Sequence, residues 1–183
     1  MGVEKYCNGD YLIICICEGT AEEDVINWLL DEDLLLFSRD ELVGKTRGKL
    51  TRTRKANKIE SEILSYDFDK DVVIFRIIDS KNEKFELGNL YKERHDVVNY
   101  ITNPEIEILM ISKCGELDKY TRKFSRQKPN EYAKEQYKVK KIKSKGTFYD
   151  FFEGDINLLI GALREHKSKK GKGHLTIYDL LTK

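Results

Sequence analysis

The sequence has no long hydrophobic run, and this absence sets the first limits on its class. No stretch of about 18 apolar residues is present, so we expect no transmembrane helix. The amino terminus lacks the basic start and small-residue cleavage site of a signal peptide, and we expect a cytoplasmic protein. A GxxxxGK[ST] segment is also missing, which argues against a nucleotide phosphotransferase that uses a P-loop.

Cysteine and histidine are scarce and poorly spaced for metal or disulfide chemistry. The four cysteines, Cys7, Cys15, Cys17 and Cys114, show no CxxC spacing, and no histidine lies near them in a zinc-ligand pattern. Cys15 and Cys17 would point to the same face of one strand, where two neighbours cannot easily bridge. We interpret them as buried thiols in a reducing cytoplasm.

The net charge is only +1, but the charge is segregated along the chain. Residues 1–41 carry eleven acidic and two basic side chains, whereas residues 42–58 carry seven basic side chains and no acidic one. Residues 119–145 carry eleven basic side chains against two acidic ones. Basic blocks attract polyanions, and acidic clusters hold metals or repel wrong partners.

The first basic block lies in a long polar loop and supplies candidate contacts to nucleic-acid phosphates. These candidates are Lys45, Arg47, Lys49, Arg52, Arg54 and Lys55. A loop of this length in a compact domain is usually functional or disordered. The alternative interpretation is a solvated linker without a ligand.

Apolar runs separated by helical patterns predict an α/β fold with a mostly parallel, four-stranded sheet. The predicted strands are residues 12–17, 34–38, 71–78 and 97–101. Asn103 and Pro104 predict the start of a further helix that runs to about residue 113, with a strand at 106–111 as the alternative. The last third of the sequence is predicted to be helical.

Two of the predicted strands end on a carboxylate, Glu18 after the first and Asp79 after the third. Thr20 and Glu23 predict a capping box for the helix that follows Glu18. The carboxyl ends of parallel strands meet at one edge of a sheet, where open α/β sheets bind ligands. Hard cations prefer oxygen ligands, so these two acids suit a metal-assisted phosphoryl site. The alternative for Glu18 is a solvated glutamate at the rim of the sheet.

Three segments, in order along the chain, resemble motifs of Toprim domains of the RloB-like and OLD-like nuclease branch. CEGTAEEDVINWL is similar to the first motif, a Glu-Gly-x-x-Glu pattern that begins at Glu18 and ends at Glu22. VVIFRIIDSK resembles the strand that carries the Asp-x-Asp motif, with Asp79 as its first acid. TNPEIEILMI resembles the Asn-Pro-x-x-Glu segment, here Asn103 to Glu107. The resemblance covers roughly residues 10–115.

The resemblance implies a Toprim-like domain at residues 1–115 and a basic helical extension at residues 116–183, packed on the same core. It also implies a metal-dependent nuclease whose candidate catalytic residues are Glu18, Asp79, Glu22 and Glu107. In this assignment Glu18 is a metal ligand or transfers a proton, and Asp79 binds Mg²⁺ or Mn²⁺. Asn103 and Glu107 would complete the wall of the pocket.

The sequence departs from the family pattern at Lys81, which stands where the second aspartate of the Asp-x-Asp motif is expected. A lysine cannot bind a cation, so another acid such as Glu83 substitutes, or one metal suffices, or catalysis is lost. The alternative function is therefore a catalytically degenerate module that binds nucleic acid or a partner protein such as an ATPase. The resemblance to this branch implies a role in phage defence. The sequence is also compatible with a homodimer.

Overall fold

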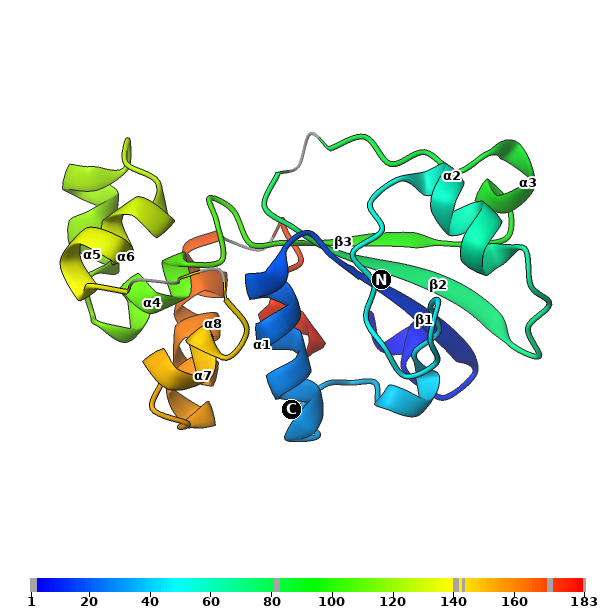
Figure 1. Ribbon diagram of the computed structural model, residues 1–183, viewed down its shortest axis with the longest axis horizontal. Helices are drawn as coiled ribbons and strands as arrows, with labels where there is room; N and C mark the ends of the chain where they lie inside the picture. The colour runs from blue at the N-terminus through cyan, green and yellow to red at the C-terminus, as the bar shows by residue number, and fades with distance from the viewer. Residues whose placement is uncertain (1–2, 81–82, 140–141, 143, 171–172, 183) are drawn as a thin grey trace.

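The molecule is organised around a parallel β-sheet. The computed structural model describes residues 3–80, 83–139, 142, 144–170 and 173–182. Within these ranges the sheet has three strands, in the order β1 (Tyr11–Cys17), β2 (Asp71–Ile78) and β3 (Val97–Ile101), all parallel (Figure 1). The α/β class, the parallel sheet and these three strands confirm the prediction.

Helical segments fill the connections and form most of the carboxyl-terminal part. In chain order they are η1 (Val3–Tyr6), α1 (Thr20–Asp31), η2 (Arg39–Glu41), α2 (Ala56–Ile59), η3 (Glu60–Leu64), α3 (Asn89–Lys92), α4 (Ile108–Lys113), α5 (Leu117–Lys119), η4 (Tyr120–Phe124), α6 (Pro129–Tyr137), α7 (Thr147–Phe151), α8 (Ile156–Lys170) and η5 (Ile177–Leu180). The described part of the chain contains no helix that is long and apolar enough to cross a membrane.

The two faces of the sheet support two separate apolar cores, because successive side chains of a strand point to opposite faces. In β1, Ile13 and Cys15 belong to the larger core, which also takes in residues of α1, α4, α8 and η5. Ile14 and Ile16 belong to the smaller core, which α2 and η3 complete on the other side of the sheet (Figure 1). Burial on both faces explains why β1 is an unbroken apolar run.

The fourth predicted strand, at residues 34–38, is wrong. Leu35 forms only a single antiparallel bridge with Leu181, and the Leu36 N–H donates to the Leu180 carbonyl at 2.8 Å. Leu35 and Phe37 are buried in the larger core. This apolar run is an irregular segment that fills the core. Its buried side chains alternate as they would in a strand, but the segment does not join the three-stranded sheet.

The free edge of β1 is occupied instead by the long basic loop. Leu42 and Thr51 form isolated parallel bridges with Ile13 and Ile16. The Thr51 N–H donates to the Cys15 carbonyl at 3.0 Å, and the Thr51 carbonyl accepts from the Cys17 N–H at 2.9 Å. The loop therefore follows β1 from its amino end to its carboxyl end.

The predicted helix start at Asn103 and Pro104 is also wrong, since α4 begins at Ile108 with Glu107 as its N-cap. Ile106 is buried, and His166 Nε2 lies 3.2 Å from the Asn103 carbonyl oxygen, which can only accept a hydrogen bond. These tertiary contacts hold the segment as a turn between β3 and α4. The helical α4 also rules out the alternative of a strand at 106–111.

The carboxyl-terminal helices pack against the sheet layer through the larger core. The Asp24 carboxylate of α1 accepts hydrogen bonds from the Gly146 N–H at 2.7 Å and the Phe148 N–H at 3.2 Å. Asp24 thus satisfies backbone donors at the start of α7, donors that a helix itself leaves unpaired. This contact joins the first helix of the chain to its last third.

Candidate functional site

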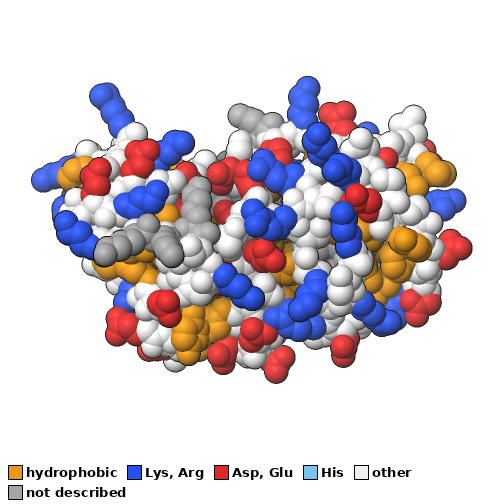
Figure 2. Space-filling view, viewed as in Figure 1, with side chains coloured by type: hydrophobic (Ala, Val, Ile, Leu, Met, Phe, Trp, Pro, Cys, Tyr) orange, Lys and Arg blue, Asp and Glu red, His pale blue; other side chains and the backbone are white. Residues whose placement is uncertain are grey.

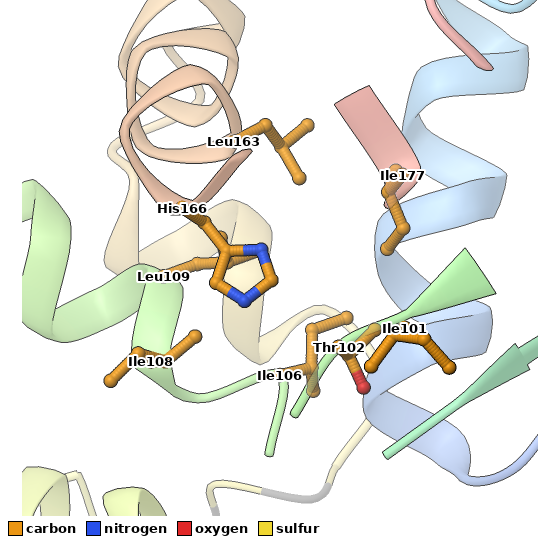
Figure 3. Close-up of a pocket in the computed structure, with 8 residues that line it drawn as sticks. All are labelled: Ile101, Thr102, Ile106, Ile108, Leu109, Leu163, His166 and Ile177. Carbon is orange, nitrogen blue, oxygen red and sulfur yellow. The ribbon is translucent and has the colours of Figure 1, made fainter. Parts of the chain in front are cut away.

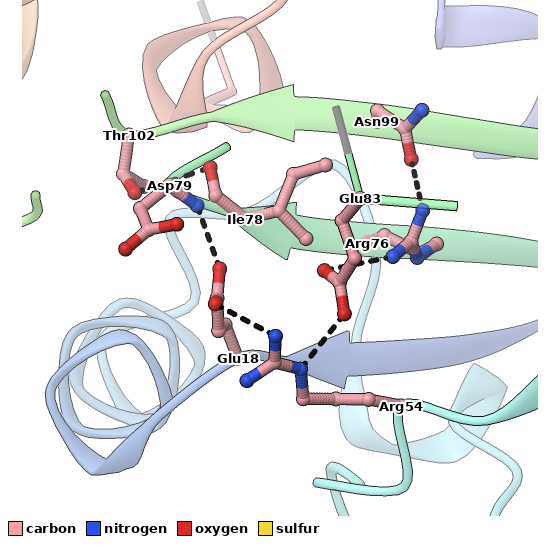
Figure 4. A network of polar contacts seen from close by, with 8 residues as sticks. All are labelled: Glu18, Arg54, Arg76, Ile78, Asp79, Glu83, Asn99 and Thr102. Carbon is pink, nitrogen blue, oxygen red and sulfur yellow. Dashed lines mark hydrogen bonds and ion pairs between the residues drawn. The ribbon is translucent and has the colours of Figure 1, made fainter. Parts of the chain in front are cut away.

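Glu18 and Asp79 lie side by side at the carboxyl edge of the sheet. They follow β1 and β2, which are parallel neighbours (Figure 4). The Asp79 N–H donates to Glu18 Oε2 at 2.8 Å, and the Glu18 N–H donates to the Ile77 carbonyl at 3.1 Å. The Glu18 carboxylate therefore spans the ends of both strands, as the strand order predicts.

Glu22 and Glu107 are buried close to these two acids. The exposed fractions are 7% for Glu22 and 2% for Glu107. Burial, together with the smaller effects of the charges of Glu107, Glu18 and Asp79, raises the pKa of Glu22 to about 7. The structure thus brings the four candidate catalytic carboxylates into one electrostatic cluster.

Gly19 gives the Glu22 side chain its position. Gly19 is the N-cap of α1, and no side chain caps this helix, so the predicted capping box of Thr20 and Glu23 is wrong. A Cβ atom at Gly19 would lie 2.9 Å from Glu22 Oε2. The carboxylate of Glu22 folds back over the helix start, and a side chain at position 19 would have to displace it.

Arg54, from the basic loop, lies between two carboxylates at this edge. Its Nη2 is 2.9 Å from Glu18 Oε1, and its Nε is 2.9 Å from Glu83 Oε1 (Figure 4). The guanidinium therefore bridges the end of β1 and the segment that follows β2. Sequence analysis predicted Arg54 as a phosphate contact and did not foresee its pairing with Glu18.

Arg76 is a buried arginine in the middle of β2, and sequence analysis missed it. Its side chain is 2% exposed; Nη2 lies 3.0 Å from Glu83 Oε2, and Nη1 donates to Asn99 Oδ1 at 3.2 Å. The guanidinium also stacks over the Phe85 ring, 4.4 Å from its centroid. Burial lowers the pKa of Arg76, and the charge of Glu83 opposes this. An arginine inside an apolar run requires a buried partner, which is the signal that could have found it.

The donor atoms of the cluster fit a hard divalent cation, which takes carboxylate oxygens as ligands. Glu22 is the clearest sign, because no other described residue donates a hydrogen bond or forms an ion pair to its buried carboxylate. Glu18, Asp79 and Glu22 are the residues that would hold such an ion. As the side chains stand in the described ranges, no three acids, histidines or cysteines form a ready metal-binding group.

The other candidate phosphate contacts lie along the basic loop. Lys45 pairs with Glu62 at 3.0 Å. Arg47, Lys49, Arg52 and Lys55 are exposed and have no hydrogen-bond or ion-pair partner for their side chains within the described ranges. Figure 2 shows Lys and Arg side chains over much of this face of the molecule, including the end formed by α5 and α6. The free cations of the loop stay available for an anionic ligand.

Two cavities lie away from the carboxylates. One of about 550 Å³ is at the amino ends of β1 and β2 and is lined in part by Arg47, Tyr66 and Asp69. The other, about 10 Å³, is enclosed by β3, α4, α8 and η5, with Thr102 and His166 as its polar lining (Figure 3). It has room for about one water molecule, so it is a packing defect rather than a substrate site.

Comparison with known proteins gives no match to any protein-family model, curated protein or solved structure. The resemblance to Toprim domains therefore depends on the three sequence segments. Lys81, where the sequence departs from the family pattern, lies outside the described residues.

Proposed function

We propose that this protein is a Toprim-like nuclease that binds nucleic acid through its basic loop and cleaves a phosphodiester bond with Mg²⁺ or Mn²⁺. The observation that carries the proposal is the cluster of Glu18, Asp79, Glu22 and Glu107 at the carboxyl edge of a parallel sheet. The charges of the other three acids raise the pKa of Glu22, and a bound cation would relieve this repulsion.

The Toprim-like assignment of the fold is part of this proposal. The three parallel strands and their carboxylate ends support it, and residues 42–51 occupy the position beside β1 where another strand would add to the sheet. The proposed division is a Toprim-like domain at 1–115 and a basic helical extension at 116–183. A cytoplasmic location, which the sequence analysis led us to expect, is also part of this proposal. A role in phage defence and an ATPase partner follow only from the resemblance.

Each group at the site has a distinct task in the proposed reaction. A bound Mg²⁺ supplies charge neutralisation at the phosphate and activation of water. Glu18 and Asp79 would hold the ion, and Glu22 would provide a further oxygen beside them. Arg52 and Lys55 come directly after Thr51, where the basic loop runs beside the carboxyl end of β1. They bind the phosphate backbone and hold the substrate against the carboxylates.

The alternative is a degenerate module that binds nucleic acid or a partner protein without cleaving it. The ion pair between Arg54 and Glu18 favours this alternative, because a guanidinium already neutralises one carboxylate of the cluster. In that case the cluster is a structural junction between the loop and the sheet.

A cleavage assay separates the two functions. Single- and double-stranded DNA and RNA are incubated with the protein in Mg²⁺, in Mn²⁺ and in EDTA. The nuclease proposal predicts cleavage of at least one substrate that EDTA abolishes. Binding of nucleic acid without any divalent-dependent cleavage would support the degenerate module.

A further inference from the structure

Arg54 is the exchangeable member of the polar network at the site. Its side chain is 45% exposed and projects from a loop, whereas Arg76 is 2% exposed and lies within a strand. With nearly half of its side chain in contact with water, the ion pairs of Arg54 are partly screened. Moving the Arg54 guanidinium into solvent therefore costs little, and moving that of Arg76 would break the core.

The carboxylates that Arg54 contacts keep other partners when it leaves. Glu83 Oε2 remains paired with Arg76 at 3.0 Å. Glu18 Oε2 continues to accept the Asp79 N–H at 2.8 Å, so the Glu18 side chain keeps its direction. Two oxygens lose a partner, Glu83 Oε1 and Glu18 Oε1, and the second of these belongs to the acids at the strand ends (Figure 4).

A second observation concerns Glu22, to which no described residue brings a positive charge even with Arg54 in place. Glu22 is more than nine-tenths buried, and no other residue of the described part donates to its carboxylate. Arg54 bonds Glu18 and Glu83, and the structure records no bond from it to Glu22. A compact divalent ion carries twice the charge of the guanidinium and prefers carboxylate oxygens.

We propose that Arg54 and a divalent cation exclude one another at Glu18, so that cation binding releases the guanidinium toward a nucleic-acid phosphate. This inference rests on the metal-dependent function proposed above. The two positive groups compete for the same oxygen, Glu18 Oε1, and repel each other at that distance. Because the released arginine becomes a phosphate contact, cation binding and nucleic-acid binding strengthen one another, and linkage requires the effect to be reciprocal.

Competition at Glu18 is tested by titrating Mn²⁺ and measuring the free ion by electron paramagnetic resonance. Arg54→Gln removes the competing charge, so we expect it to bind Mn²⁺ about three- to tenfold more tightly than the wild type. Arg94→Gln, at an exposed arginine in the turn between α3 and the amino end of β3, is the matched control and should bind like the wild type. Glu18→Gln in the Arg54→Gln background should remove the gain, which places the ion at Glu18.

Release of the side chain is followed directly in the wild type, by the ¹⁵Nε–H signal of Arg54 during a Mg²⁺ titration. The signal should move toward that of a solvated arginine, since the Nε–H bond to Glu83 is lost. Thermal unfolding checks that each variant folds, and Arg54→Lys is used if Arg54→Gln does not.

The outcomes separate the two proposals. Equal Mn²⁺ affinity in wild type and Arg54→Gln, with an unmoved Nε signal, overturns the exchange but leaves a metal-dependent nuclease intact. Absence of Mn²⁺ binding in both proteins overturns the exchange together with the metal-dependent function.

Discussion

The Arg54 guanidinium lies 2.9 Å from the Glu18 carboxylate and joins the basic loop to the acidic edge of the sheet. The contact places the loop's positive charge beside the acids, where a substrate phosphate would also have to lie. It relates the two charge blocks of the sequence, the acidic first 41 residues and the basic residues 42–58, to one location.

The first prediction concerns the pH dependence of stability through Glu22. Its pKa is raised from 4.5 to about 7 by burial and by neighbouring acids, so the folded state binds this proton more tightly than the unfolded state. The resulting stabilisation is complete below pH 4.5 and is lost as pH rises through about 7. The shift corresponds to about 3 kcal/mol.

Glu22→Gln keeps the neutral shape and removes this titration. We expect the variant to be about 1–3 kcal/mol more stable than the wild type at about pH 8, with little difference at about pH 4. Urea unfolding at several pH values measures both curves. Parallel curves across this range would show that Glu22 does not titrate with a raised pKa.

The second prediction concerns the buried pair of Arg76 and Glu83. Arg76→Met should lower the free energy of unfolding by about 2–4 kcal/mol, because Asn99 and one oxygen of Glu83 lose their partner. Arg94→Met, at an exposed arginine, should change it by about 0.5 kcal/mol or less. Chemical denaturation measures both, and similar losses in the two variants would contradict a structural role for Arg76.

The third prediction concerns the basic loop. If the loop contacts duplex DNA, affinity falls with salt with a slope of about 0.9 per phosphate neutralised. Replacing Arg47, Arg52 and Arg54 with Ala should flatten this slope, whereas Lys5→Ala, at a lysine paired with Asp96, should not. Binding titrations by fluorescence anisotropy at several salt concentrations give the slopes. The same slope in the wild type and both variants would show that the basic loop does not contact the DNA phosphates.

The fourth prediction concerns Mg²⁺ and thermal stability. A ligand that binds only the folded state raises its melting temperature, by about 2–4 °C for each kcal/mol in a chain of this size. Glu18→Gln and Asp79→Asn should each abolish the rise without unfolding the protein. Differential scanning calorimetry measures it. A rise that survives both changes would place any bound Mg²⁺ elsewhere.

The sequence predicted the sheet best where apolar runs are buried on both faces, as in β1 and β2. It failed at residues 34–38, because a short apolar run that fills a core looks the same as a strand until its neighbours are known. It also failed at Asn103 and Pro104, where contacts of Ile106 and His166 outweigh the local helix signal. Local pattern alone carries no information on these tertiary contacts.

The acids of the site were predictable because strand ends in a parallel sheet share one edge, which brings Glu18 and Asp79 together. The contacts of the arginines were not predictable, since the pairing of Arg54 with Glu18 joins residues that are distant in the sequence. Arg76 was visible as one charged residue within an apolar strand. Its partner Glu83 could be found only from the fold of the segment after β2.

The central claim is that divalent-dependent cleavage depends on the carboxylates at this edge of the sheet. The most direct test compares cleavage by the wild type, Asp79→Asn and Asp71→Asn, the last at the exposed amino end of the same strand. We predict that the wild type and Asp71→Asn cleave in Mg²⁺ or Mn²⁺, and that Asp79→Asn folds but does not cleave. Cleavage that persists in Asp79→Asn, or that is absent from the wild type with every substrate, would contradict the account.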